Sequence, residues 1–101
     1  MSSEDVPEPV EARPWTAEDG PWPAVTVYPA ADRPALWVWS AGRWRRGEVY
    51  ARQIWRPSAR WPQGRLVYQV SVDLRGDALV RLALYEWPQP GLRVEPGESE
   101  T

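Results

Sequence analysis

The sequence predicts a small all-β domain, and three observations support this prediction. Hydrophobic and polar residues alternate along residues 35–55, 65–73 and 78–87, which is the pattern of strands that bury one face. Proline or glycine separates these stretches, and both residues favour turns over continued regular structure. Every hydrophobic run over residues 35–95 either alternates in this way or is interrupted by proline or glycine. We therefore expect no helix longer than two turns in that region.

Residues 35–55, with the sequence ALWVWSAGRWRRGEVYARQIW, form the clearest predicted β-hairpin. The Ala41-Gly42 pair marks its turn, because glycine readily adopts the backbone angles that tight turns require. The stretch contains four of the eight tryptophans, which is more aromatic surface than one face of a hairpin can bury. Gly47 interrupts the alternation and predicts a bulge that bends the second strand.

Four further strands are predicted, at residues 24–28, 65–73, 78–87 and 92–95. Residues 78–87 are rich in alanine and leucine, which favour helix, but they alternate and follow the preceding strand after a short turn, so we expect a strand. Asp73 and Asp77 flank that turn, where carboxylates accept hydrogen bonds from the backbone. The WPQPG motif at residues 87–91 predicts a tight, 3₁₀-like turn before the last strand.

Charge divides the chain into three parts. Residues 1–23, hereafter the arm, contain six acidic residues against one arginine, a net charge of −5, and five prolines that exclude a regular helix. Residues 24–95 contain eleven arginines against six acidic residues, a net charge of +5, and form the predicted domain. Residues 96–101 are an acidic tail that we expect to be disordered. In the arm we expect disorder up to about Ala12, whereas Trp15 and Trp22 predict that residues 13–23 lie across the domain.

The composition excludes several classes of protein. The chain has no cysteine and no histidine, so a disulfide is excluded and a structural zinc site lacks its usual ligands. We expect no metal and no cofactor, and the bulky aromatic residues must supply much of the core. No hydrophobic run approaches the ~20 residues of a membrane span, and the N-terminus lacks a basic and apolar leader. These features predict a cytoplasmic protein without a membrane partner.

The order of the strands predicts a small five-stranded SH3-like barrel over residues 35–95. The first pair is bent at a glycine, a meander follows, and a prolyl turn precedes the last short strand; closing such a sheet removes its exposed edges. VWSAGRWRRGEVYAR resembles the opening hairpin of Tudor-type domains, in which one aromatic residue precedes a glycine-containing turn and another follows it. QVSVDLRGD is similar to the third strand and turn of that family, and GLRV is similar to its closing strand.

The resemblance implies a ligand site at the first turn. Trp39 and Trp44 match the two aromatic residues that flank this turn in the ligand cage of Tudor domains. Val72 and Leu74 stand where the family has further aromatic residues, so half of the cage does not match. The resemblance therefore implies a general SH3-like module, and it does not carry over the reading of methylated arginine or lysine.

The sequence does not indicate catalysis. Nucleophilic catalysis needs a base, which is most often histidine, and histidine, cysteine and lysine are all absent. Asp73 and Asp77 are the closest acidic pair in the predicted domain, but we expect them to cap their turn. The sequence also contains no GxGxxG, GKS or GKT motif that would hold nucleotide phosphates. We therefore predict a protein that is not an enzyme.

Two functions remain. Because clustered exposed aromatic residues mark interfaces, the first is a protein-interaction module that binds another protein or a second copy of itself through Trp39, Trp44, Tyr50, Trp55 and Trp61. The alternative is the binding of single-stranded nucleic acid, because these aromatic residues are interleaved with arginines that can hold phosphate, namely Arg43, Arg45, Arg46, Arg52, Arg56, Arg60 and Arg65. We expect residues 4–19 of the acidic arm to shield part of this basic face.

Overall fold

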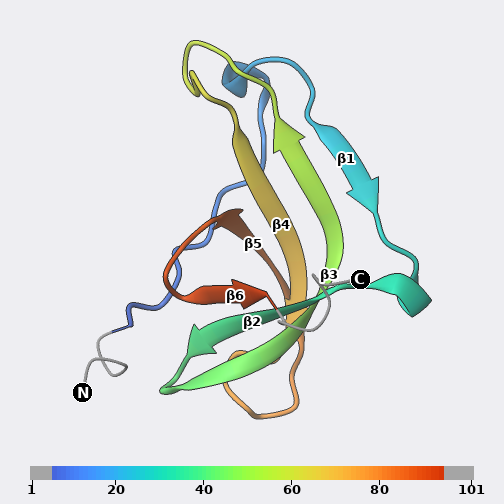
Figure 1. Cartoon of the computed structure of the whole chain (residues 1–101), viewed down its shortest axis with the longest axis vertical. Coiled ribbons are helices and arrows are strands. Elements are labelled where there is room, and N and C mark those ends of the chain that lie inside the picture. The colour runs from blue at the N-terminus through green and yellow to red at the C-terminus, as the bar shows by residue number, and fades with distance from the viewer. Residues whose placement is uncertain (1–5, 95–101) are drawn as a thin grey trace.

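The computed structural model describes residues 6–94 and shows an all-β fold (Figure 1). Its strands are β1 (Ala24–Val27), β2 (Ala35–Ser40), β3 (Arg43–Trp55), β4 (Arg65–Val72), β5 (Arg81–Trp87) and β6 (Leu92–Val94). Two single turns of 3₁₀ helix, η2 (Ala17–Asp19) and η3 (Ala30–Asp32), precede β1 and β2 respectively. The all-β prediction is confirmed. The predicted tail at residues 96–101 lies outside the described residues.

Within the described residues, six antiparallel strands form one sheet in the order β5-β4-β3-β2-β6, and β1 pairs with β3 beside this path. The length of β3 allows it to hold two neighbours along one edge. Its first half pairs with β2, where Leu36 lies opposite Gly47, and its second half pairs with β1, where Val25 lies opposite Gln53. The end strands β5 and β6 do not pair with each other, so the sheet is open. The predicted closure into a five-stranded barrel is therefore not found.

Part of the outer edge of β5 is covered by the arm instead of by another strand. Glu11 forms an antiparallel bridge with Tyr85, and the Ala12 N–H donates to the Leu84 carbonyl at 2.8 Å. Residues 6–12, which we expected to be disordered, therefore lie along the sheet. The arm then continues toward the far ends of β3 and β4, as Figure 1 shows in blue. The prediction that residues 13–23 lie across the domain is confirmed by the hydrogen bond between Trp61 and Asp19.

The bulge of β3 lies at Tyr50. The register between β3 and β4 shifts between Val49 and Ala51, so one extra residue of β3 is accommodated there. The predicted bulge at Gly47 is wrong, because the pairing with β2 runs unbroken through that residue. Gly47 is required for close packing instead: a Cβ atom there would lie 2.7 Å from a methyl group of Val70.

The turn between β2 and β3 is confirmed at Ala41 and Gly42. Both residues have positive φ angles, 53° and 82°, which is the geometry of the two-residue turns that match the twist of a hairpin. The tight turn places the two strands in register from their first pair, Ser40 opposite Arg43. The aromatic residues on either side of the turn consequently face each other across the ladder.

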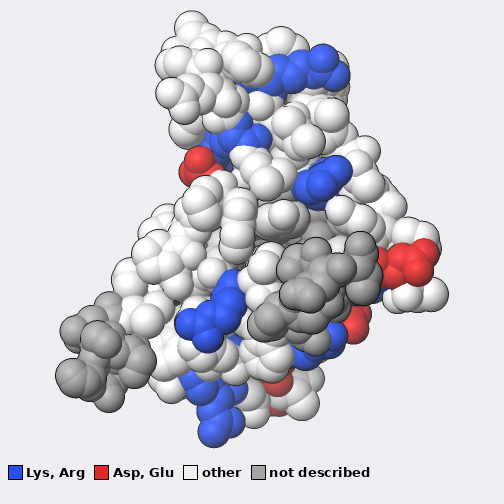
Figure 2. All heavy atoms as spheres, viewed as in Figure 1, with Lys and Arg blue, Asp and Glu red and all other residues white. Residues whose placement is uncertain are grey.

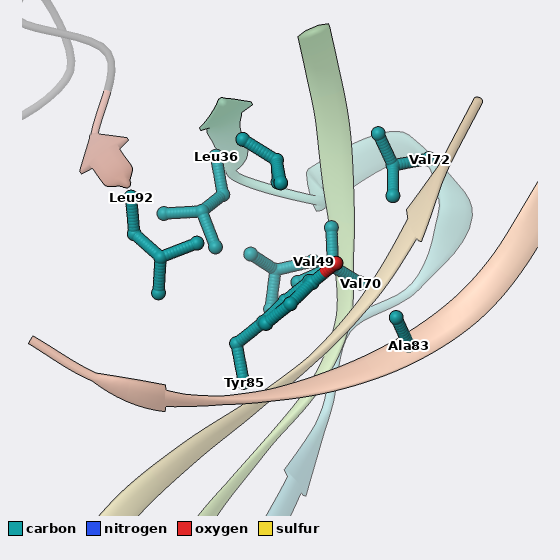
Figure 3. Packing of buried hydrophobic residues seen from close by; sticks show 8 residues of the cluster. Leu36, Val49, Val70, Val72, Ala83, Tyr85 and Leu92 are labelled. Carbon is teal, nitrogen blue, oxygen red and sulfur yellow. The ribbon is translucent and has the colours of Figure 1, made fainter. Parts of the chain in front are cut away.

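The hydrophobic core lies on the concave side of the bent sheet, where five strands each contribute side chains (Figure 3). The Tyr85 ring of β5 extends into this core and is only 2% exposed, and Val38 and Val70 are fully buried. Val70 and Val72 alternate along β4 and both lie in this core, and Val67 on the opposite face of β4 is buried as well. The core consists of Leu36, Val38, Val49, Val70, Val72, Ala83, Tyr85 and Leu92.

The loop between β4 and β5 is longer than the sequence predicted, because β5 begins at Arg81 and not at Ala78. The Asp73 carboxylate accepts hydrogen bonds from the backbone N–H groups of Gly76, Asp77 and Ala78, at 2.8–3.2 Å. Burial opposes ionisation of Asp73, but these hydrogen bonds hold its pKa below the usual value. The predicted capping role of Asp73 is confirmed, and the cap fixes residues up to Ala78 in the turn.

Candidate functional site

The predicted aromatic residues fall into separate groups along β3. Trp39 and Trp44 lie at the turn between β2 and β3, whereas Trp55 ends β3 and contacts Trp61 in the following loop. Tyr50 lies between them at the bulge, 37% exposed, with the guanidinium of Arg33 over its ring. The five residues therefore do not form one continuous binding surface.

Trp39 and Trp44 form a half-buried pair at the turn between β2 and β3. They are directly opposite each other in the ladder, and their rings meet edge to face with centroids 5.4 Å apart. The Arg93 guanidinium from β6 lies 4.1 Å from the Trp44 ring centroid, an arrangement that favours a cation–π interaction. Trp44 is thus covered on one face, while Trp39 borders the neighbouring groove.

The groove beside Trp39 has a volume of about 400 Å³. Four segments form its walls: the end of β2, the loop from β4 to β5, β5 itself and the arm. Its lining includes the buried Tyr85, whose surroundings raise its pKa to about 12, mainly because burial disfavours the phenolate. Leu79 and Val80 lie on its loop wall with 72% and 63% of their surfaces exposed. These two neighbouring side chains form a small exposed hydrophobic patch on this wall.

The charges in the groove are mixed. Glu8 and Glu11 of the arm and Asp77 of the loop face the groove together with two arginines, Arg75 and Arg81. Glu11 and Arg81 form an ion pair at 3.3 Å. Arg75 forms no ion pair with the carboxylates of residues 6–94. The groove therefore combines exposed hydrophobic side chains with a cation that a ligand could neutralise.

Trp55 is buried, contrary to its prediction as a contact residue. It is 1% exposed, and its indole N–H donates to the Gln53 side chain at 2.9 Å. The Arg65 guanidinium lies over the Trp55 ring at 4.5 Å and over the Trp61 ring at 4.0 Å. The extra residue at Tyr50 places Trp55 on the face of the sheet opposite Val49, and residues distant in the sequence cover that part of the face. Trp55, Trp61 and Arg65 form a second, smaller core at the far end of β3.

Asp19 joins the arm to this second core. Its side chain is buried and accepts two hydrogen bonds from Arg13, at 2.6 and 2.8 Å, and one from the Trp61 indole at 3.0 Å. The Thr16 backbone N–H donates a further bond at 2.8 Å. The hydrogen bonds from Arg13 are the main reason that the pKa of Asp19 lies far below its usual value. Trp61 is therefore half-buried and holds the arm in place.

Trp22 does not act as the anchor that we predicted. Its ring stacks on Trp15 at 4.4 Å but remains 75% exposed. No direct signal in the sequence indicated that Arg13 pairs with the buried Asp19, the contact that fixes the arm instead. The only hint was a carboxylate three residues after Thr16, the spacing of a capping box, which the structure contains at η2.

The arginines predicted to hold nucleic acid do not form one free face. Arg65 has a side chain only 8% exposed and pairs with Glu86 at 2.9 Å. Arg60 faces the arm carboxylates Glu18 and Asp19 at 3.8 and 3.7 Å, which is the part of the predicted shielding that the structure contains. Figure 2 shows basic side chains in separate patches on the face in view.

The other predicted arginines mostly contact the chain itself. The Arg45 side chain donates to the Ser40 carbonyl at 3.1 Å, and that of Arg56 donates to the Trp22 carbonyl at 3.2 Å. Arg46 lies 4.0 Å from Glu48. Arg52 is half-buried and Arg43 is exposed.

Gln89 is a contact residue that the sequence did not single out. Its side-chain carbonyl accepts from the Val10 N–H at 2.9 Å, and its amide donates to the Val10 carbonyl at 3.2 Å. Next to it, Gly91 approaches the arm so closely that a Cβ atom would lie 2.6 Å from the Pro7 carbonyl oxygen. A glutamine between two prolines in a turn carries no signal of this role in the sequence.

Residues 6–94 contain no cluster of three or more acidic side chains, histidines or cysteines that could hold a metal ion. In the same range no helix has the length and hydrophobicity needed to cross a membrane. No family model, curated protein or solved structure matches the chain.

Proposed function

We propose that this chain is a small protein-interaction module, without catalytic activity, that binds an extended segment of another protein in the groove beside Trp39. The groove carries this proposal, because it places exposed hydrophobic side chains, Leu79 and Val80, next to a half-buried indole. Concave sites lined by hydrophobic side chains, with a few polar or charged groups, are typical ligand-binding sites. Nucleic-acid binding has less support, because the arginines that would hold phosphate are dispersed and several are already paired.

We also propose that the fold is a variant of the SH3-like class. Two features support this: β3, β4 and β5 form a meander, and the prolyl turn after Trp87 returns the chain so that β6 pairs with β2. The groove lies between the first turn and the loop after the third strand of this arrangement, where the resemblance to Tudor-type domains implied a ligand site. The open edge at β5 departs from a closed barrel.

To test this proposal, peptides that bind the full chain are selected from a displayed library of random peptides. Selected peptides are then measured against Leu79→Gln, with Leu82→Gln as the matched control. Both leucines are at least half exposed, but only Leu79 lines the groove. We expect Leu79→Gln to weaken binding about tenfold, because a leucine side chain buried by a ligand contributes ~1.5–3 kcal/mol, and Leu82→Gln to leave it unchanged. Equal effects of the two variants, or no selected binder, would contradict the proposal.

A further inference from the structure

The first part of the arm lies on the sheet in the manner of a bound peptide. From Pro7 to Ala12 the chain is extended and follows the turn before β6 and then the edge of β5. The Ala12 N–H donates to the Leu84 carbonyl at 2.8 Å, and Val10 exchanges two hydrogen bonds with the Gln89 side chain. The Gln89 side chain thus bonds both backbone polar groups of Val10, as the backbone of a neighbouring strand would. The isolated bridge to β5 resembles the addition of a strand to an open sheet edge, which is a common way to bind a peptide.

These contacts depend on the arm's backbone more than on its side chains. Val10 is 74% exposed, and the other residues that follow Pro7 bury little hydrophobic surface. Because Gly91 has no side chain, the Pro7 carbonyl and the Pro9 ring can lie where a Cβ atom at that position would be. A segment from another protein with proline at these two places could make the same contacts.

Charge adds a second requirement. The Glu8 carboxylate accepts a hydrogen bond from the Ala41 N–H at the β2–β3 turn, at 2.8 Å. Glu11 pairs with Arg81, and Arg75 on the same groove is left without an ion pair among the described residues. An acidic segment therefore fits this surface, and one with an additional carboxylate near Arg75 would fit it better than the arm does.

We propose that the edge of β5, Gln89 and Gly91 form a docking site for an extended, acidic, proline-containing segment of another protein, and that residues 7–12 of the arm occupy this site in the free chain. This inference rests on the proposed function and names the class of ligand. The groove remains about 400 Å³ in volume with the arm in place. A partner that also fills the groove gains contacts that the arm does not make.

The arm competes as a tethered ligand. A short flexible tether gives an effective concentration of the order of millimolar, so a partner must bind better than the isolated arm segment to displace it. Binding of the arm to the docking site can be weakened by substitutions in the arm, which leave the docking site unchanged. Val10→Pro and Ala12→Pro remove the two N–H donors, and the rest of the arm stays anchored by Arg13 and Asp19.

The experiment measures binding of a fluorescent synthetic peptide with the sequence of residues 4–13 by anisotropy. The proteins are the full chain and the full chain with Val10→Pro and Ala12→Pro. We expect the variant to bind the peptide about tenfold more tightly than the unmodified chain, because two hydrogen bonds no longer favour the tethered arm. A peptide methylated at the Val10 and Ala12 nitrogens has the same charge and prolines, and we expect it to bind at least tenfold more weakly.

A third protein tests the docking site itself. Gly91→Ala, added to the two proline substitutions, should abolish peptide binding, since the new Cβ would lie 2.6 Å from the Pro7 carbonyl position and 2.7 Å from the Pro9 ring. Far-UV circular dichroism checks that all three proteins are folded. Equal binding of the methylated peptide, or equal binding by the unmodified and the proline-substituted chains, would overturn the proposal. If library peptides bind through Leu79 while this peptide does not bind the variant, the docking proposal fails and the proposed function stands.

Discussion

Replacing Trp55 with phenylalanine separates the two roles that the sequence left open for this residue, core and contact surface. The indole is 1% exposed, donates to Gln53 at 2.9 Å and lies under the Arg65 guanidinium. Phenylalanine keeps an aromatic ring against Arg65 but loses the N–H donor and part of the ring surface. The change therefore removes defined interactions without introducing a polar group into the second core.

The expected loss of stability follows from these contacts. A hydrogen bond between uncharged groups contributes ~0.5–1.5 kcal/mol, and the smaller ring leaves a void that costs a further ~1–2 kcal/mol. We expect the free energy of unfolding to fall by about 2–3 kcal/mol. That is a large fraction of the ~5–15 kcal/mol that stabilises a typical small domain.

The assay is urea unfolding followed by far-UV circular dichroism, with Trp22→Phe as the matched control. Trp22 is 75% exposed, so the same substitution there should change the free energy of unfolding by less than about 0.5 kcal/mol. Peptides selected for the groove should bind Trp55→Phe normally, because that residue lies at the other end of β3. If Trp55→Phe is as stable as Trp22→Phe, or loses groove binding while remaining stable, the assignment of Trp55 to a core is refuted.

Three further predictions concern pH and packing. The pKa values of Asp19 and Asp73 are lowered in the folded state, so the unfolded chain takes up their protons first as the pH falls below about 4. The melting temperature should therefore fall with pH in that range. Asp19→Asn should make the melting temperature depend less on pH. The pKa of Tyr85 is raised to about 12, so its contribution to stability is complete below pH ~10 and is lost as the pH rises toward 12. Melting temperatures measured over this pH range should fall less for Tyr85→Phe than for the unmodified chain. An equal fall for both proteins would contradict the prediction. Gly47→Ala should lower the free energy of unfolding by about 1–3 kcal/mol through overpacking against Val70, whereas full stability in urea unfolding would show that β4 can move aside.

Local patterns predicted the strands well but not their assembly. The alternation over residues 35–55 and the turn at Ala41-Gly42 are local features, and the hairpin, its turn and the pairing of Trp39 with Trp44 follow from them. The start of β5 was misplaced by three residues, because the hydrogen bonds that Asp73 makes up to Ala78 depend on the three-dimensional path of the loop.

The binding surface was predicted less well, because exposure depends on contacts distant in the sequence. The sequence suggested that Trp55 and Arg65 lie on a free face, Trp55 as a contact residue and Arg65 as a residue that holds phosphate. Only the structure shows that the arm and the loop after β3 cover this face, through Asp19 and Trp61. Gly47 was misjudged for a related reason, since its role comes from the side chains of β4 and not from its own strand.

The open edge of β5 restricts what kind of partner the site can accept. An unpaired edge exposes backbone N–H and carbonyl groups and invites pairing with other chains, and in this protein Glu11 and Ala12 of the arm cover part of it. A ligand that displaces the arm and covers the edge buries these groups, and leaving them unpaired away from water costs free energy. An extended segment can pair with them again, whereas a helix has no backbone groups free to do so. Displacement of the arm and pairing of an extended partner with β5 should therefore occur as one coupled event.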